Sequence, residues 1–366
     1  MTTKDPNTRS IFVLSTFLCR DRITERTVER AKRSTMRTYN TLLTTNEARS
    51  ADLPLVARFL VTGATWEVST NSPEILSVME HISQLDKEGL LAPDLMLFFY
   101  VDFGLSDRDA RCRPYFRALE HLYYGTYGPG DSMLIDQQGR RVVGSMCPAT
   151  AHDMDYWKRV ILPCLAGITS ACVGIAPLHC ACVVRDRFGL LIHGESGAGK
   201  STLALSLSLN GFSYLADDCT YLSRSSEDRV QCWGSSAPLK LVPDAITYFP
   251  KLAELTVGES MNGEPAYEVD PAAVFGVSCA PNCDPRWIIF LEKRHRSNPT
   301  FHKISGTEAA DRLATSLECL PPSVAAQRDH QLALIDILVQ RGAWILQHDL
   351  RPEALALAIS QFCNNN

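Results

Sequence analysis

The chain has 366 residues, with 36 Lys and Arg against 41 Asp and Glu, and a formal net charge of −5. This balance lacks the basic footprint of a nucleic-acid-binding protein, and no apolar run reaches the roughly 20 residues of a membrane helix. We therefore expect neither nucleic acid nor a membrane as a partner. Thirteen cysteines are spread along the chain, and the N-terminus shows no signal-peptide pattern, which favours free thiols and a cytoplasmic protein.

Residues 1–165 predict a mixed α/β domain without a catalytic signature of its own, and we expect this domain to recognise the substrate. A strand is predicted at residues 11–14. The Arg-rich segment 20–37 also contains acids, so it favours an exposed helix with ion pairs one turn apart rather than a targeting segment. A basic docking surface for an acidic partner is the alternative interpretation.

Beyond residue 52 this half alternates between strand and helix patterns. Asn71, Ser72 and Pro73 are typical of a helix start, and apolar residues follow them at helical spacing. The predicted elements are a strand pattern at 53–68, a helix at 74–84, a strand at 96–101, a helix at 115–122, and strands at 133–135 and 141–143.

A longer helix is predicted at residues 155–171, with a kink at Pro163, and we place the domain boundary inside it, giving domains of residues 1–165 and 166–366. The second half predicts strands at 179–184, 189–192, 212–216, 286–293 and 344–346, and helices at 202–209, 307–319, 325–340 and from residue 350 onward.

A glycine-rich stretch lies between the strand at 189–192 and the helix at 202–209. Strand, glycine loop and helix in this order, with the spacing Gly-x-x-x-x-Gly-Lys-Ser, predict a phosphate-binding loop of the Walker A type. The residues predicted to bind ATP are Gly194, Glu195, Ser196, Gly197, Ala198, Gly199, Lys200, Ser201 and Thr202.

Each part of this loop suits a triphosphate. Glycines turn tightly and let backbone N–H groups point at phosphate oxygens, while the following helix directs the positive end of its dipole at the same anion. Lys200 reaches the terminal phosphates, and the Ser201 hydroxyl is placed to bind Mg²⁺. The alternative is a glycine-rich turn that binds nothing.

Two adjacent aspartates, Asp217 and Asp218, follow the strand at 212–216. Two carboxylates beside an apolar strand are costly without a cation, and Mg²⁺ bound with a nucleotide supplies one. One carboxylate is enough to hold the metal, so the other is available to accept a proton from an attacking hydroxyl. The alternative is a solvated turn.

Two further features have open interpretations. Lys240 lies in a loop that leads into a strand, where it is either a contact to phosphate or substrate or a surface lysine. Cys180 and Cys182, and likewise Cys279 and Cys283, form close pairs, but neither pair is completed to four ligands by the sequence around it. A metal–thiolate site therefore stays an alternative rather than the expectation.

His179, the loop at 194–202 and the pair Asp217-Asp218 together resemble the catalytic domain of bacterial HPr kinase/phosphorylase, in the phosphoenolpyruvate-carboxykinase-like branch of P-loop proteins. His179 precedes Gly194 by fifteen positions, and Asp217 follows Ser201 by sixteen. The resemblance covers roughly residues 175–350 and implies an α/β fold, with a C-terminal P-loop kinase domain built on a mixed sheet.

The resemblance also implies roles for individual residues. Lys200 would hold phosphate, Ser201 and Asp218 would hold Mg²⁺, and Asp217 would be the catalytic base, with His179 hydrogen-bonded into the same catalytic cluster. Thr202 stands where HPr kinases carry an acid, and the glycine-containing segment that follows their Asp pair is not found here. The chain is therefore more similar to the HPr-kinase-related proteins of peptide-modification clusters, which include kinases of lasso-peptide precursors.

The sequence thus predicts a kinase that uses ATP and Mg²⁺ to phosphorylate a hydroxyl, of Ser or Thr, in a peptide or small protein. By the same resemblance, a homo-oligomer is a candidate assembly. Two other functions stay open. One is a nucleotide-sensing module without catalysis, and the other is an ABC-type ATPase, whose metal-binding strand the apolar run ending at Glu292 imitates.

Overall fold

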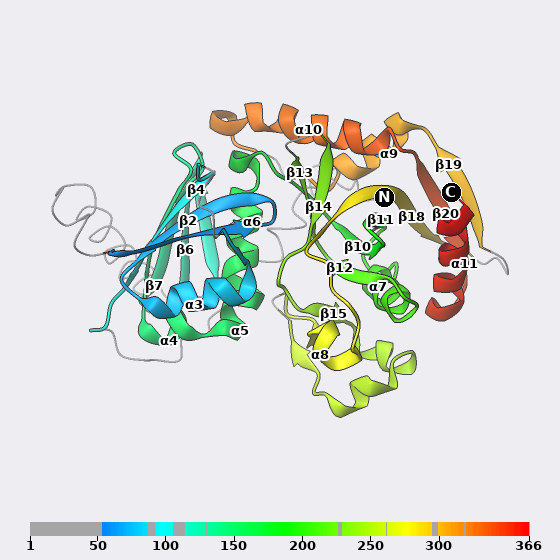
Figure 1. The fold of residues 1–366 in the computed structure, drawn as a ribbon, viewed down its shortest axis with the longest axis horizontal. Coiled ribbons are helices and arrows are strands. Elements are labelled where there is room, and N and C mark those ends of the chain that lie inside the picture. The colour runs from blue at the N-terminus through cyan, green and yellow to red at the C-terminus, as the bar shows by residue number, and fades with distance from the viewer. Residues whose placement is uncertain are drawn as a thin grey trace, which may run out of the picture. The chain divides into compact units, whose positions relative to one another are not determined.

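A computed structural model describes the chain over residues 53–86, 92–104, 114–128, 130–225, 229–260, 262–294, 299–317 and 320–365. The strand predicted at 11–14 and the helix predicted at 20–37 lie outside these residues. The chain divides into two compact units, unit 1 (Met1–Val173 with Cys319–Arg328) and unit 2 (Gly174–Glu318 with Asp329–Asn366). Both combine helices with a mixed sheet, so the fold class is mixed α/β (Figure 1).

The sheet of unit 1 has eight strands among the described residues, in the order β3-β1-β2-β4-β8-β7-β6-β5. The central strand β4 pairs in parallel with β2 and β8, and the remaining pairs are antiparallel. The strands are β1 (Leu55–Val61), β2 (Ala64–Thr70), β3 (Gln84–Leu85), β4 (Leu95–Val101), β5 (Tyr115–Leu119), β6 (Leu122–Gly128), β7 (Asp131–Asp136) and β8 (Arg141–Met146).

Helices of unit 1 bury large apolar side chains. The first helix buries Ile75, Val78, Met79 and Ile82, at the helical spacing that the sequence predicts. Trp157 contacts Phe99 of β4 edge to face, with ring centroids 5.6 Å apart. The helical elements are α3 (Pro73–Ile82), α4 (Pro148–His152), α5 (Met154–Tyr156), η2 (Trp157–Ile161), α6 (Leu162–Thr169) and η3 (Ala171–Val173).

The helix predicted at 115–122 is wrong, because this segment forms the hairpin of β5 and β6. Glu120 takes a positive φ of 52° at the turn, which interrupts any helical pattern. In β5 only Phe116 is buried, so the segment lacks the apolar stripe that a packed helix needs. Aromatic residues favour strands on a partly buried sheet, and that preference prevails here.

The kink predicted at Pro163 takes the form of a widened helical turn. The five residues of η2 are π-helical, and the regular helix α6 follows directly. Proline has no N–H to donate to the carbonyl four residues earlier, and a π-turn accommodates such a break without ending the helix.

The main sheet of unit 2 has nine strands among the described residues, in the order β12-β10-β11-β18-β14-β13-β9, with β20 beside β18 and β19 beside β20. Strand β18 pairs in parallel with β11 and with β20. The strands are β9 (Ala176–Leu178), β10 (Cys180–Arg185), β11 (Phe188–His193), β12 (Ser213–Ala216), β13 (Thr220–Arg224), β14 (Val230–Trp233), β18 (Asn282–Lys293), β19 (Thr300–Ile304) and β20 (Ala343–His348).

Both faces of this sheet are buried, and alternate residues of β10 supply the two cores. Cys180 and Cys182 belong to the core that includes Leu338, whereas Ala181 and Val183 belong to the core on the opposite face. The helices α9 (Gly306–Ala314) and α10 (Ala326–Val339) cover the first face, and α7 (Lys200–Leu209) and α11 (Pro352–Asn365) cover the second.

A small lobe, residues 239–277, packs beside this sheet through its own apolar core. Leu205 of α7 and Tyr214 of β12 belong to that core together with lobe residues such as Leu239 and Phe249. The lobe contains β15 (Leu239–Leu241), η4 (Pro243–Thr247), η5 (Pro250–Glu254), β16 (Gly258–Glu259), β17 (Pro265–Val269) and α8 (Pro271–Phe275).

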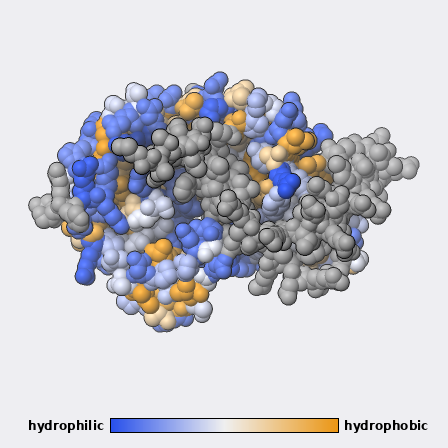
Figure 2. All heavy atoms as spheres, turned by 180° about the vertical axis from the view of Figure 1, so that it is seen from behind, coloured by the Kyte–Doolittle hydropathy of each residue, from blue (hydrophilic) through white to orange (hydrophobic). Residues whose placement is uncertain are grey.

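The molecular face drawn in Figure 2 mixes hydrophilic residues with separate groups of hydrophobic ones. Exposed large hydrophobic residues such as Leu119, Leu209 and Leu357 lie on different elements. None of the helices in the described parts of the chain combines the length and the apolar character needed to cross a bilayer.

Candidate functional site

The candidate site of unit 2 lies where two strands of the same direction end. Strand β10 pairs antiparallel with β11 on one side and with β12 on the other, so β11 and β12 run the same way. The glycine loop follows β11 at Gly194, and the aspartate pair follows β12 at Asp217. The sheet topology therefore brings two segments that α7 separates in sequence to one edge of the sheet.

The glycine loop has the strand before it and the helix after it that the sequence predicts. Gly197 and Gly199 take positive φ angles of 78° and 93°, and nothing lies within 4 Å of the place where a Cβ would stand. Position 194 requires glycine for a different reason, because an added Cβ would lie 3.1 Å from Ala198 and 3.3 Å from Leu291. The loop thus needs glycine for backbone conformation at two positions and for close packing at a third.

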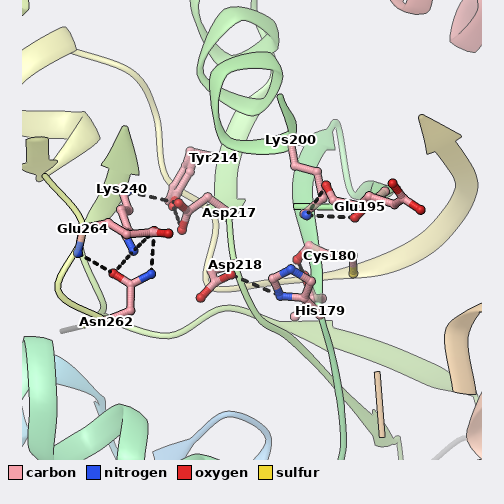
Figure 3. Close-up of polar contacts among 12 residues, drawn as sticks. His179, Cys180, Glu195, Lys200, Tyr214, Asp217, Asp218, Lys240, Asn262 and Glu264 are labelled. Carbon is pink, nitrogen blue, oxygen red and sulfur yellow. Dashed lines mark hydrogen bonds and ion pairs between the residues drawn. The ribbon is translucent and has the colours of Figure 1, made fainter. Parts of the chain in front are cut away.

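Lys200 begins helix α7, and its ammonium reaches back over the loop (Figure 3). Its Nζ donates to the carbonyl oxygens of Gly194 at 2.9 Å and Glu195 at 3.3 Å. The residue is 7% exposed, and burial lowers the pKa of Lys200, although the charges of Asp218 and Asp217 oppose that shift. A buried ammonium that rests on carbonyl oxygens gains a stronger partner when an anion binds beside it.

Asp217 turns inward at the end of β12 and is 6% exposed. Its Oδ1 accepts a hydrogen bond from the Tyr214 hydroxyl at 3.1 Å, and its Oδ2 accepts one from the backbone N–H of Lys240 at 3.0 Å. The Ser201 side chain, at the end of the loop, acts to lower the pKa of this carboxyl group. Burial, and secondly the charge of Asp218, raise the pKa of Asp217 to about 6.

Asp218 points the other way, and its side chain is 73% exposed. Its Oδ1 lies 3.1 Å from Nδ1 of His179, which immediately precedes β10. Desolvation acts to raise the pKa of Asp218, but the hydrogen bond and charge of His179, with the charges of Lys200 and Lys240, outweigh it and lower the pKa below its usual value. The two neighbouring carboxylates therefore have opposite surroundings, as two successive residues at a strand end should.

Lys240 contributes to the site through its backbone more directly than through its ammonium. Its N–H holds Asp217, whereas its Nζ donates to Oδ1 of Asn262 at 2.8 Å and lies 3.6 Å from a carboxylate oxygen of Glu264. In Figure 3 the Lys240 side chain extends toward Asn262 and Glu264. The predicted contact of this side chain with phosphate or substrate stays a prediction.

Cys182 and Cys283 meet in the sheet core rather than at this site, and Cys279 is exposed. The Sγ atoms of Cys182 and Cys283 lie 3.8 Å apart across β11, where an added Cβ on Gly189 would lie 2.4 Å from the Cys283 sulfur. Across the described residues, no group of three or more His, Cys, Asp or Glu side chains is placed to hold a metal ion. The metal–thiolate alternative is therefore not found in this part of the chain.

Sequence reasoning missed three groups that surround the site. Tyr214 and the N–H of Lys240 hydrogen-bond to Asp217. His193 ends β11, and burial, then the charge of Lys200, lower its pKa to about 4, so it is neutral at pH 7. The position of His193 directly before the loop was a usable signal, but a backbone N–H donated from 23 residues away leaves none in the sequence.

Comparison with known proteins shows a distant structural likeness. No protein-family model matches the chain, and no curated protein matches it in sequence. Among solved structures, the chain is similar to the structure of the Hpr(Ser) kinase/phosphatase from Coxiella burnetii, with 18% identity, a TM-score of 0.29, and coverage of 52% of this chain and 88% of that one. A TM-score this low supports no inference about activity.

Proposed function

We propose that this protein is an ATP-dependent kinase that transfers a phosphoryl group to a hydroxyl of a peptide or small protein. The observation that carries the proposal is that the glycine loop after β11 and the aspartate pair after β12 lie at one edge of the sheet. The buried ammonium of Lys200 lies within the charge field of both aspartates, and Ser201 of the loop acts to lower the pKa of the buried Asp217. An anion-binding loop, a buried cation and a carboxylate base at one strand edge are the parts that phosphoryl transfer needs.

The loop residues fit a nucleotide triphosphate. Gly197 and Gly199 leave open space on the side where a Cβ would stand. An anion can therefore come close to the backbone N–H groups of the loop there. Helix α7 begins at Lys200 and directs its positive end at the same space. We assign the binding of the phosphates to residues 194–202, with Lys200 exchanging its carbonyl contacts for phosphate oxygens.

The same residues fit Mg²⁺ bound together with the nucleotide. Asp218 offers an exposed carboxylate of lowered pKa, and Ser201 offers a hydroxyl at the start of α7. Mg²⁺ in kinases takes one or two protein ligands and completes its shell with phosphates and water, so a cluster of three protein acids is not required. When bound, the ion would supply positive charge that stabilises the transferring phosphoryl group.

Asp217 is suited to accept the proton of the attacking hydroxyl. With a pKa of about 6 it is ionised at pH 7 while staying a stronger base than an ordinary carboxylate. The bond from the terminal phosphorus to ADP breaks, a bond to the acceptor oxygen forms, and the acceptor proton passes to Asp217. Tyr214 and the Lys240 N–H hold this carboxylate in place, and His179 orients Asp218 beside it.

An ABC-type ATPase is disfavoured by the surroundings of Glu292. This residue lies near the end of β18, the parallel neighbour of β11, where such ATPases carry a metal-binding carboxylate. Its Oε1 lies 3.4 Å from Arg312, and its Oε2 accepts a hydrogen bond from Gln347 at 3.2 Å. A carboxylate engaged by an arginine and an amide is poorly placed to bind a metal ion.

The test uses the full chain with γ-labelled ATP, Mg²⁺ and peptide libraries that carry a fixed Ser, Thr or Tyr. We expect label to transfer to a Ser or Thr library, and we expect Asp217→Asn to abolish transfer while calorimetry still detects ATP binding. Release of ADP without an acceptor is measured in parallel, because acceptor-independent hydrolysis would favour an ATPase.

The kinase proposal is contradicted if the wild-type protein binds ATP but labels no library, and if Asp217→Asn changes neither the labelling nor the release of ADP. That result would favour the nucleotide-sensing module. Absence of ATP binding altogether would remove both nucleotide functions. We further propose that the N-terminal half recognises the acceptor. Comparing phosphoryl transfer to the best library by truncated and full-length proteins would test this.

A further inference from the structure

A second lysine rests on the glycine loop. Lys293 ends strand β18, and its Nζ donates to the carbonyl oxygen of Gly197 at 3.0 Å. Lys200 makes the same kind of contact with the carbonyl of Gly194 at 2.9 Å. Two ammonium groups from distant parts of the chain therefore lie on backbone oxygens of one loop.

The position of Lys293 follows from the sheet. Strands β11 and β18 are parallel, with His193 opposite Phe290, so β18 also ends at the edge where the loop begins. Gly194 lies against Leu291, and Lys293 follows two residues later on the same side of the strand. Ligands of open α/β sheets bind beyond the carboxyl ends of their strands, which is where this ammonium lies.

The acid next to Lys293 is turned away from it. Glu292 lies on the opposite side of the strand, where Arg312 and Gln347 engage its carboxylate. The Lys293 side chain is exposed, so its ammonium is free to move without disturbing the core. A neutral carbonyl is a weaker partner for an ammonium than a phosphate oxygen, since hydrogen bonds between two charged groups are shorter and stronger.

We propose that Lys293 is a second phosphate-binding lysine, which exchanges the Gly197 carbonyl for the phosphate chain of the bound nucleotide. This inference rests on the proposed function, because it needs the loop to bind a polyphosphate. Lys200 approaches the phosphates from the start of α7, and Lys293 approaches them from the end of β18. The polyphosphate is then held between two cations that come from different elements.

The experiment compares ATP binding by five full-length proteins in calorimetry with Mg²⁺ present: wild type, Lys200→Ala, Lys293→Ala, Lys293→Arg and Lys251→Ala. Lys251 is the matched control, because it is also exposed and its Nζ donates to a backbone carbonyl, that of Val274 at 3.4 Å, away from the loop. We expect Lys293→Ala to weaken ATP binding about tenfold, as for the loss of one charge-assisted contact. Lys293→Arg should keep most of the affinity, and Lys251→Ala should match wild type.

Inorganic tripolyphosphate is titrated as a second probe. A similar loss for tripolyphosphate in Lys293→Ala supports a contact to phosphate rather than to the nucleoside. Equal affinities of Lys293→Ala and wild type, when Lys200→Ala loses binding, would overturn the role of Lys293 and leave the loop assignment intact. A wild-type protein that binds neither probe would overturn the proposed function as well.

Discussion

Each unit of this protein buries an aspartate, and the two aspartates differ in what surrounds them. Asp131 of unit 1 is 2% exposed, and Asp217 of unit 2 is 6% exposed. Asp131 accepts hydrogen bonds from the N–H of Cys147 at 2.6 Å and from the Thr150 hydroxyl at 2.5 Å. Asp217 likewise accepts from a backbone N–H and a tyrosine hydroxyl, but a second carboxylate, that of Asp218, stands next to it.

Burial of a carboxylate therefore does not by itself mark a reactive site. Burial is the largest cause of the raised pKa of both Asp131 and Asp217. The donors of Asp131 lie at the start of α4, so that carboxylate fixes a helix end to a strand. Asp217 differs because its neighbours include the loop residue Ser201 and the charged carboxylate of Asp218. A carboxylate that only fixes a helix end to a strand does not need either neighbour.

The largest expected effect separates the two aspartates by activity. Asp217→Asn should lower the rate of phosphoryl transfer about 10³-fold, roughly 4 kcal/mol, because the amide cannot accept the acceptor proton. Asp131→Asn should leave the rate near that of wild type. Turnover of labelled ATP on the best peptide library measures both, and a comparable loss in the two variants would remove the distinction between them.

The second effect is on stability, and here the two aspartates should behave alike. The folded-state pKa of Asp217, about 6, lies above its ordinary value of 3.8, so its contribution to stability is complete below pH 3.8 and is lost as the pH rises through 6. Asp217→Asn should therefore stabilise the metal-free protein at pH 8, by at most about 3 kcal/mol, and have little effect at pH 3.5. The sign is the same for Asp131→Asn, since burial also raises that pKa.

Thermal unfolding in a chelating buffer at several pH values, followed by circular dichroism, measures this effect. In each variant the new amide keeps both hydrogen-bonding contacts if the neighbouring hydroxyl turns to accept instead of donate. That hydroxyl belongs to Tyr214 in Asp217→Asn and to Thr150 in Asp131→Asn. A melting temperature of Asp217→Asn below that of wild type at pH 8 would contradict the raised pKa. Stabilisation in both variants, with activity lost in only one, would separate burial from catalysis.

The fold was predictable from sequence where local chemistry decides it. The glycine loop, its flanking elements and the aspartate pair are contiguous, and each carries its own signal. The hairpin at 115–128 was not predictable, because its aromatic residues suit a partly exposed sheet that the segment itself does not specify. The same holds for the π-turn before Pro163, since proline predicts a break but not the form that it takes.

The contacts that complete the site depend on long sequence separations. The carbonyl of Gly197 and the ammonium of Lys293 lie 96 positions apart, and the N–H of Lys240 meets Asp217 across 23 positions. Neither lysine stands in a motif. The order of strands in the main sheet brings Lys293 to the loop, and the packing of the small lobe against α7 and β12 brings Lys240 to Asp217. Both depend on packing over the whole unit rather than on residues near the site.

A third prediction compares a cation in each unit. Arg58 of unit 1 lies 2.9 Å from the carboxylate of Glu67, whereas Lys200 of unit 2 rests on the loop carbonyls. Lys200→Ala should weaken ATP binding about 50-fold, or about 2.3 kcal/mol, because phosphate loses its buried cationic partner. Arg58→Ala should leave ATP affinity unchanged. Calorimetric titration with ATP and Mg²⁺ measures both, and unchanged binding by Lys200→Ala would mean that the loop does not hold the nucleotide.

The smallest expected effect compares a histidine–aspartate contact in each unit. Nδ1 of His179 lies 3.1 Å from the Asp218 carboxylate, and Nε2 of His121 in unit 1 lies 3.9 Å from that of Asp136. His179→Gln should lower turnover about tenfold with little change in melting temperature, because Asp218 loses the group that orients it. His121→Gln should leave turnover unchanged. Measuring turnover and melting temperature on both variants distinguishes the roles, since a structural His179 would shift the melting temperature and spare the rate.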